Sequence, residues 1–271
     1  MKLRTILMIT SLAAVAATIT SCNFSSDDLN RLARKEAGKD SYRDSEKWGK
    51  VVTQTIEVED FTHINLKGNA DIKFTQGDEL KVEAYGNEKA IAENDITVKD
   101  GTLIVAQKTG SKGTVPTIKI MVTAPNLESI DVSGTGDVEI KDENELEGDL
   151  QILISGTGDV DLERVECRQL TVHIIGKGDI TAEKIKCEKA DISISGDGDM
   201  KADVKANDIQ VEIGGTGDAD LDVKCQDLTV TAGGTGEVEL KGECAHLTKK
   251  SGGMASIDSR RLTIHEDIRI Q

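Results

Sequence analysis

Six carboxylates recur at one position of a short repeated motif, and they are the first candidates for chemistry in this chain. The motif reads GTGD, GTGD, GKGD, GDGD, GTGD and GTGE along the sequence. Its acidic residues are Asp137, Asp159, Asp179, Asp199, Asp218 and Glu237. Carboxylate oxygens are ligands that Ca²⁺ prefers, and the motif superficially resembles the calcium-binding nonapeptide GGxGxDxUx. A row of these side chains would therefore offer oxygen ligands to Ca²⁺.

The spacing of the motif limits this interpretation. Successive first glycines lie 22, 20, 20, 19 and 19 residues apart, whereas the calcium-binding repeat is about nine residues long. Carboxylates stacked one per turn, at the roughly 4.8 Å between neighbouring strands, would repel by about 1 kcal/mol even in water. Hydrogen bonds from backbone N–H groups in turns would offset that repulsion. We expect this structural role, with Ca²⁺ as the alternative.

Four cysteines recur at a second position of the repeat. Cys167, Cys187, Cys225 and Cys244 lie 20, 38 and 19 residues apart, and Ala206 completes the column. These are not the spacings of a metal site, and buried Cys packs like a small apolar residue. We expect a core ladder of thiols. An exported compartment would also allow the disulfides Cys167–Cys187 and Cys225–Cys244.

The elements that must position these columns are strands. Around each motif, apolar and mostly β-branched residues alternate with polar ones, which is the period of a half-buried strand. A repeat near 20 residues is typical of a solenoid, and repeats of helix pairs run to roughly 33 residues or more. The sequence predicts an all-β parallel β-helix, or β-solenoid, with about 20 residues and three short strands per coil. Its repeats occupy about 130–258.

The second glycine of each motif has a predicted backbone role. A coil corner needs residues at positive φ, which Gly adopts at little cost. We therefore predict positive φ at the six second glycines, which are Gly136, Gly158, Gly178, Gly198, Gly217 and Gly236.

The segments that flank the repeats are β-rich but less regular. Residues 100–101 are Asp-Gly between two alternating stretches, a strong hairpin signal, and residues 68–71 read as a degenerate motif copy. We expect the coils to begin near Phe61, with the hairpin as an insertion or an N-terminal cap. Residues 262–270 would be a strand that closes the open edge. Residues 51–271 would then form one β-helix domain.

The N-terminus has the pattern of a lipoprotein signal peptide over residues 1–21. Two basic residues precede an apolar run at 6–19 that is too short to span a bilayer comfortably. Small residues before Cys22 resemble a lipobox, although Ile19 stands where Leu is usual. We expect lipidation at Cys22 and a polar tether at 22–50. The alternative is an ordinary signal peptide with an incidental Cys22.

The charge of the chain bounds its partners. The net charge is −16, and the mature chain without Lys2 and Arg4 carries 31 − 49 = −18. Such a chain is repelled by nucleic acid and by anionic lipid, so membrane attachment would come from the lipid anchor. Asp27 and Asp28 weakly resemble the signal that sends lipoproteins to the outer leaflet, against the alternative of a solvated linker. We expect a protein anchored to the outer membrane of the cell envelope, facing the periplasm or the surface.

The sequence contains no motif of a nucleophilic, metalloprotease or nucleotide-binding site. Polysaccharide lyases and hydrolases also use parallel β-helices, so a polysaccharide-active enzyme is one alternative. A sugar cleft would need stacking aromatics, but the domain has no Trp after Trp48 and only Tyr85 as tyrosine. We predict a non-enzymatic module that binds an extracellular protein or glycan, with a purely structural envelope component as the other alternative. No cofactor is expected apart from the Ca²⁺ considered above.

Several short segments together resemble one family. They are Phe61–Ile64, Asn69–Ile72, Gly101–Val105, Ala124–Leu127 and the run of Ser-Gly-Thr-Gly-Asp copies, and they cover roughly 51–253. In this order they resemble the head GIN domain family, the "putative auto-transporter adhesins" among lipoproteins of Gram-negative bacteria. The resemblance implies a right-handed β-helical domain on the cell envelope and a role in adhesion. No catalytic residues come with it.

Overall fold

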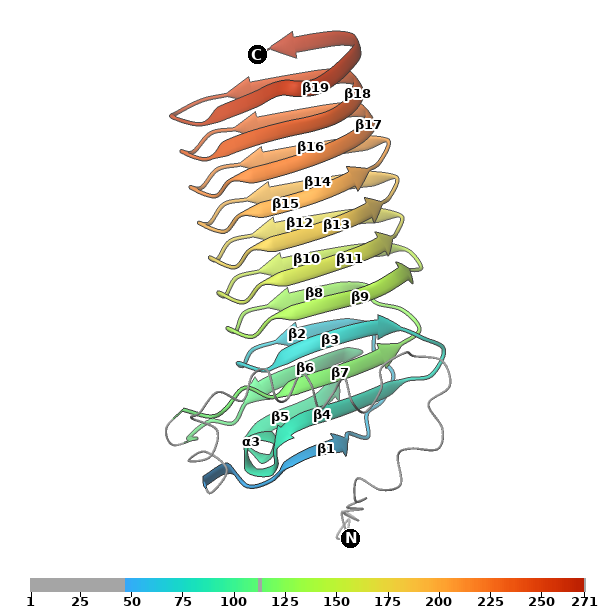
Figure 1. Cartoon of the computed structure of the whole chain (residues 1–271), viewed down its shortest axis with the longest axis vertical. Helices are drawn as coiled ribbons and strands as arrows, with labels where there is room; N and C mark the ends of the chain where they lie inside the picture. Colours follow the sequence, from blue (N-terminus) through green and yellow to red (C-terminus); the bar gives the residue numbers. More distant parts are fainter. Residues whose placement is uncertain (1–46, 112–113, 271) are drawn as a thin grey trace.

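The chain folds into a β-solenoid of about 7 turns with roughly 20 residues per coil. The computed structural model describes residues 47–111 and 114–270. It is nearly all β, with 62% of residues in strands and 3% in helices. Figure 1 shows the coils stacked along one axis, with two layers of strands facing each other. The predicted fold class is therefore confirmed.

The regular coils begin at the first copy of the motif. One layer holds β8 (Ser129–Val132), β10 (Asp149–Ile154), β12 (Gln169–Ile174), β14 (Lys189–Ile194) and β16 (Asp208–Ile213). The other holds β9 (Val138–Glu145), β11 (Val160–Glu166), β13 (Ile180–Lys186) and β15 (Met200–Lys205). β17 (Ala219–Ala232), β18 (Glu237–Ser251) and β19 (Ser256–Ile270) run on through both layers. Each strand pairs in parallel with its counterpart one coil away.

Each coil has two strands rather than the three predicted. In β11, Leu162 and Val165 both point inward although they are three positions apart, with two residues between them. The strand therefore bends between them without ending, and its register against β9 shifts there. The last two predicted strands of a coil are thus the two halves of one bent strand.

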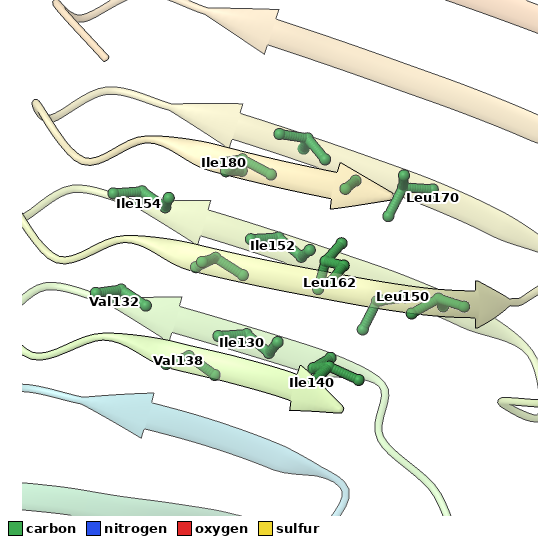
Figure 2. Close-up of a cluster of buried hydrophobic side chains, with 14 of the residues drawn as sticks. Ile130, Val132, Val138, Ile140, Leu150, Ile152, Ile154, Leu162, Leu170 and Ile180 are labelled. Atoms are coloured by element: carbon green, nitrogen blue, oxygen red, sulfur yellow. The ribbon is translucent and has the colours of Figure 1, made fainter. Parts of the chain in front are cut away.

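Columns of aliphatic side chains fill the space between the layers. Figure 2 shows Ile130 and Ile152 directly above one another, with Val138 and Ile140 reaching in from the opposite layer. A further column, six residues before the first glycine, was not predicted: Leu150, Leu170, Ala190, Ile209, Leu228 and Leu247 are all buried. Burying one such Leu stabilises the fold by about 1.5–3 kcal/mol. Each coil therefore encloses a wider core than the predicted columns of apolar residues indicate.

The N-terminal elements form a coil and a cap. They are β1 (Val51–Thr55), β2 (His63–Leu66), β3 (Asp71–Gln76), β4 (Lys81–Asn87), α3 (Glu88–Ala92), β5 (Asn94–Lys99), β6 (Thr102–Gln107) and β7 (Lys119–Ala124). β5 and β6 form the predicted hairpin, with Asp100 and Gly101 at φ of 50° and 72°. The antiparallel strands β1 and β4 lie with α3 at this end of the solenoid.

The coils do not stack in chain order. β2 lies between β6 and β8, and β3 lies between β7 and β9. The coil near Phe61 is therefore second in space, and the coil of β6 and β7 lies beneath it (Figure 1). This arrangement places residues of β2 beside residues of β8, far apart in the sequence.

The longest motif spacing has a local cause. The first regular coil contains extra residues at a bend, where Asp142 has a φ of 66°. Asn144 occupies the inward position that Val165 holds in the next coil and is 1% exposed. Its amide donates to the carbonyls of Lys141 and Asp142, and its Oδ1 accepts from the N–H of Gln76. This buried Asn therefore holds the bend that accommodates the insertion.

The C-terminal strand is longer than predicted. β19 begins at Ser256 rather than at Leu262 and pairs with β18.

Within the described part of the chain, no helix is long and apolar enough to cross a membrane.

Candidate functional site

The second glycines of the motif are required for close packing, not for their backbone angles. None of the six has a positive φ, so that prediction is wrong. A Cβ on any of them would lie 1.9–2.2 Å from the carbonyl oxygen of the residue one coil below, Ala70 for Gly136 and the preceding second glycine for the others. The turns of neighbouring coils thus touch backbone to backbone, and any side chain would force them apart.

The first glycines pack in the same way. A Cβ on Gly134 would lie 2.0 Å from the carbonyl oxygen of Gly68, which confirms residues 68–71 as a motif copy. Gly214 lies directly before the first glycine Gly215, and a Cβ there would have no atom within 4 Å. The requirement for glycine therefore changes between adjacent residues.

The carboxylate row forms a hydrogen-bonded spine along this corner. Oδ1 of each aspartate accepts from the backbone N–H of the acidic residue in the next coil, at 2.6–2.9 Å from Asp137 to Glu237. Asp71 extends the spine through a 3.3 Å bond from the N–H of Asp137. These bonds are the structural role expected from the sequence, and they offset the repulsion between neighbouring carboxylates.

The row does not converge as a Ca²⁺ site would. Within residues 47–111 and 114–270, no group of three or more His, Cys, Asp or Glu side chains is arranged to hold a metal ion. Each row carboxylate up to Asp218 already uses one oxygen for the spine, and the side chains lie one behind the other along the axis. The arrangement thus favours the structural interpretation over a calcium cage, which gathers 6–8 oxygens about one point.

The four cysteines line a different corner as free thiols. Cys225 and Cys244 are direct partners in the ladder, while Cys167 and Cys244 are buried and the other two are half-buried. Hydrogen bonding to Cys187, together with burial, raises the pKa of the Cys167 thiol, and the same bond lowers the pKa of Cys187. Burial raises the pKa of Cys225 to about 12. The column is therefore a ladder at the edge of the core, in which the pKa of Cys187 is lowered and the pKa values of the other three thiols are raised.

A shallow groove runs beside the cysteine ladder, bordered by Lys186, Lys205 and Lys224 from successive coils. Lys186 pairs with Glu166 at 2.5 Å, and Lys224 pairs with Glu243. Most of the charge along this groove is thus neutralised within the protein.

The last two outward residues of the strands in one layer carry fewer charges than the outward residues of the other layer, although the first outward residue is charged in four of the strands concerned, as Asp149, Lys189, Asp208 and Asp227. We define the neutral face by two outward residues from each of six coils: Ser129, Asp131, Gln151, Leu153, Thr171, His173, Asp191, Ser193, Gln210, Glu212, Thr229 and Thr231. The charged face has the corresponding residues Glu139, Lys141, Asp161, Glu163, Thr181, Glu183, Lys201, Asp203, Asp220, Asp222, Glu239 and Lys241. Three of the first twelve are ionisable as acids or strong bases, against eleven of the second twelve. A partner would desolvate far fewer charges on the neutral face.

Ion pairs occupy much of the charged face. Lys141 pairs with Glu163 at 3.1 Å, and Lys241 pairs with Asp220 at 2.6 Å. Burial, with Glu139 as the nearest added negative charge, raises the pKa of Asp161. The lysines of this face are outnumbered by its carboxylates, eight acids to three bases, so the ion pairs leave it with a net negative charge.

A family model described as "Putative auto-transporter adhesin, head GIN domain" matches residues 60–204 and 192–270. The chain belongs to this family. No curated protein matches the chain.

Three solved structures share the family fold. A putative adhesin from Bacteroides fragilis is 26% identical, with a TM-score of 0.72, and the match covers 78% of this chain and 97% of that one. A putative adhesin from Parabacteroides distasonis is 21% identical, with a TM-score of 0.63 and coverage of 82% and 98%. A putative lipid binding protein from the same species is 18% identical, with a TM-score of 0.62 and coverage of 82% and 97%. The two Parabacteroides structures support the fold alone.

The predicted lipidation site, Cys22, lies outside the described residues, as does most of the predicted tether. Sequence reasoning missed the contrast between the two faces, although it can be read from the residue types once each position is assigned to the inside or outside of a coil.

Proposed function

We propose that this protein is a non-enzymatic adhesin of the cell envelope, anchored to the outer membrane by a lipid at Cys22. The solenoid serves as a rigid spacer that displays the neutral face to an extracellular partner. Family membership supports the adhesin role and a place on the cell envelope or surface. The signal-peptide pattern of residues 1–21 supports the anchor.

The contrast between the two faces carries the proposal. Nine of the twelve neutral-face residues are uncharged, and most of them are short hydroxyl or amide side chains. Such a surface can form hydrogen bonds with few ion pairs to break, Lys189–Asp191 being one, whereas desolvating charges opposes binding on the other face. Coil stacking also makes the face long and flat, which suits an extended partner.

Two threonines provide a matched test. Thr171 lies on the neutral face and Thr181 lies on the charged face, ten residues further along the chain. Purified protein would be tested for binding to immobilised glycans and to surfaces coated with extracellular-matrix proteins. We expect Thr171→Arg to weaken binding by about tenfold or more, since a long cation on the face blocks close approach. Thr181→Arg should leave binding unchanged. Loss of binding in Thr181→Arg alone would assign the function to the other face.

Lipidation is tested separately. Cells that express the full chain would be labelled with radioactive palmitate, and the membrane fraction would be compared with that of Cys22→Ala. We expect label and membrane retention only with Cys22. Equal retention of both proteins would argue for a different mode of attachment.

A further inference from the structure

Two shielded oxygens lie beside each other on the outer side of the solenoid at the start of the regular coils. They are Asn65 Oδ1 and Asp131 Oδ1, and neither has a hydrogen-bond donor among the residues that the structure describes. The two residues are direct neighbours in β2 and β8, and Asp131 belongs to the neutral face. Buried acceptors without donors destabilise a fold and are rare in native proteins. Two of them side by side therefore call for an explanation.

The bond between the two side chains does not meet this need. Asn65 Nδ2 donates to Asp131 Oδ2 over 3.4 Å, which is long for a hydrogen bond. It leaves the second oxygen of Asp131 and the amide oxygen of Asn65 unpaired. The pair therefore presents two acceptors.

Aliphatic side chains border the pair on both sides. The column runs Ile104, Asn65, Asp131, Leu153 through the neighbouring strands β6, β2, β8 and β10, and Figure 1 shows these strands in that order. All four side chains point outward and are half-buried. A ligand at this position would meet two acceptors flanked by two apolar surfaces.

This combination matches the chemistry of a sugar ring. A sugar offers hydroxyl donors at its edge and C–H groups on its faces, and at this position aliphatic side chains, rather than aromatic rings, would contact the C–H groups. The net charge of −16 disfavours acidic sugars by repulsion. Both side chains are half-buried, so part of each is open to solvent. Rotation of Asn65 about its broad terminal torsion would bring its amide oxygen outward, whereas a half-turn of the Asp131 carboxylate only exchanges its two equivalent oxygens.

We propose that Asn65 and Asp131 form a subsite for a neutral, hydroxyl-rich glycan. The two oxygens accept hydroxyl protons from the sugar, and Ile104 and Leu153 pack against its C–H face. This inference rests on the proposed function, because it places a ligand at one end of the neutral face.

An aspartate on the charged face allows a controlled test. The carboxylate of Asp220 has a partner, since it accepts from Lys241 at 2.6 Å. Asp131→Ala and Asp220→Ala would be compared with the unmodified chain on an array of neutral and acidic glycans, and each melting temperature would be measured. We expect Asp131→Ala to weaken neutral-glycan binding by about tenfold or more, and Asp220→Ala to change it little.

Stability separates a ligand-binding role from a structural one. Because Asp131 Oδ1 lacks a donor, Asp131→Ala should melt no lower than the unmodified chain, so the variant remains folded. Asn65→Ala should behave in the same way. A clear fall in melting temperature on Asp131→Ala would assign the residue a structural role and overturn the proposal.

The binding results distinguish this inference from the proposed function. If Thr171→Arg abolishes glycan binding but Asp131→Ala does not, the subsite is wrong and the neutral face remains the binding surface. If the chain binds only protein ligands, only acidic glycans or no glycan, the subsite is also wrong. If Thr171→Arg has no effect on any partner, the proposed function itself fails.

Discussion

Replacing Gly217 with alanine tests whether the turns stack by backbone contact. An added Cβ would lie 2.0 Å from the carbonyl oxygen of Gly198 and 2.8 Å from Cγ2 of Ile194, where ordinary contact begins at 3.4 Å. Both obstacles belong to the coil below, and one of them is backbone that cannot rotate away. The two coils must separate locally, which strains the spine bond between Asp199 and Asp218 as well.

Overpacking of this kind costs about 1–3 kcal/mol in well-packed interiors. We expect a value of about 3 kcal/mol for Gly217→Ala, the upper end, because the obstacle is fixed. For a domain of this size each kcal/mol lowers the melting temperature by about 2–4 °C, so the expected fall is about 6–12 °C. Thermal unfolding followed by circular dichroism at 218 nm, roughly the β-sheet minimum, would measure it.

Gly214→Ala is the matched control in the same turn. A Cβ at Gly214 has no atom within 4 Å, and its φ is not positive. The control should melt at the parent temperature or slightly above, because alanine restricts the unfolded chain. Gly217→Asn separates the steric explanation from a conformational one, since Asn tolerates a left-handed backbone better than Ala does. Equal melting temperatures for Gly217→Ala and Gly214→Ala would refute the proposal that the turns stack by backbone contact. A smaller fall in melting temperature for Gly217→Asn than for Gly217→Ala would indicate instead that glycine is needed for its backbone conformation.

Three further measurements examine the carboxylates and the thiols. Removing the spine acceptor with Asp199→Ala should destabilise the fold by about 1 kcal/mol in urea unfolding, while Asp199→Asn retains an acceptor and should cost less; equal losses would contradict the spine. Burial and the neighbouring Asp222 raise the pKa of Asp203, so its charge destabilises the native state above that raised pKa and the penalty disappears as pH falls below about 4. Because Asp203 is exposed, solvent screens the repulsion, and Asp203→Asn should stabilise the fold at pH 7 by only a few tenths of a kcal/mol, about 0.3, and have no effect at pH 3; a pH-independent gain would disprove the linkage. Cys187 should react with iodoacetamide faster than the equally half-buried Cys225, because its pKa is lowered while that of Cys225 is raised to about 12; mass spectrometry without reduction that finds neither thiol modified would instead indicate disulfides.

The coil itself was predictable because its information is repeated. Every copy presents apolar residues at the same offsets from its glycines, so the strands, their inward faces and the approximate coil length follow from the alignment. The buried column that begins at Leu150 was not predicted, because the first copy of the repeat has Glu128 at the equivalent position and the buried residue there is Leu127. The bend within β11 was not predicted either, because a strand that bends interrupts the alternation of inward and outward residues without ending.

The role of the glycines could not be settled from the sequence. Gly has two distinct uses, access to positive φ and the absence of a Cβ, and both produce the same residue at the same position. The structure separates them in two ways: Gly217 does not have a positive φ, and a Cβ on it would lie 2.0 Å from the carbonyl oxygen of Gly198 in the coil below. The structural role of the acidic row was easier to predict. Stacked carboxylates repel one another unless donors compensate them, and the turn offers backbone N–H groups nearby.

The candidate glycan subsite depends on a place where the solenoid departs from chain order. Asn65 and Asp131 are 66 residues apart in sequence, and they meet because the coil of β2 and β3 is inserted between those of β6–β7 and β8–β9. A regular coil continues the pattern of its neighbour, so its outward polar groups find partners that recur with it. At this junction two unrelated segments meet, and the repeat provides no partner for their oxygens. The same irregularity that hides the position from sequence analysis therefore creates the unmet hydrogen-bonding capacity that a ligand can use.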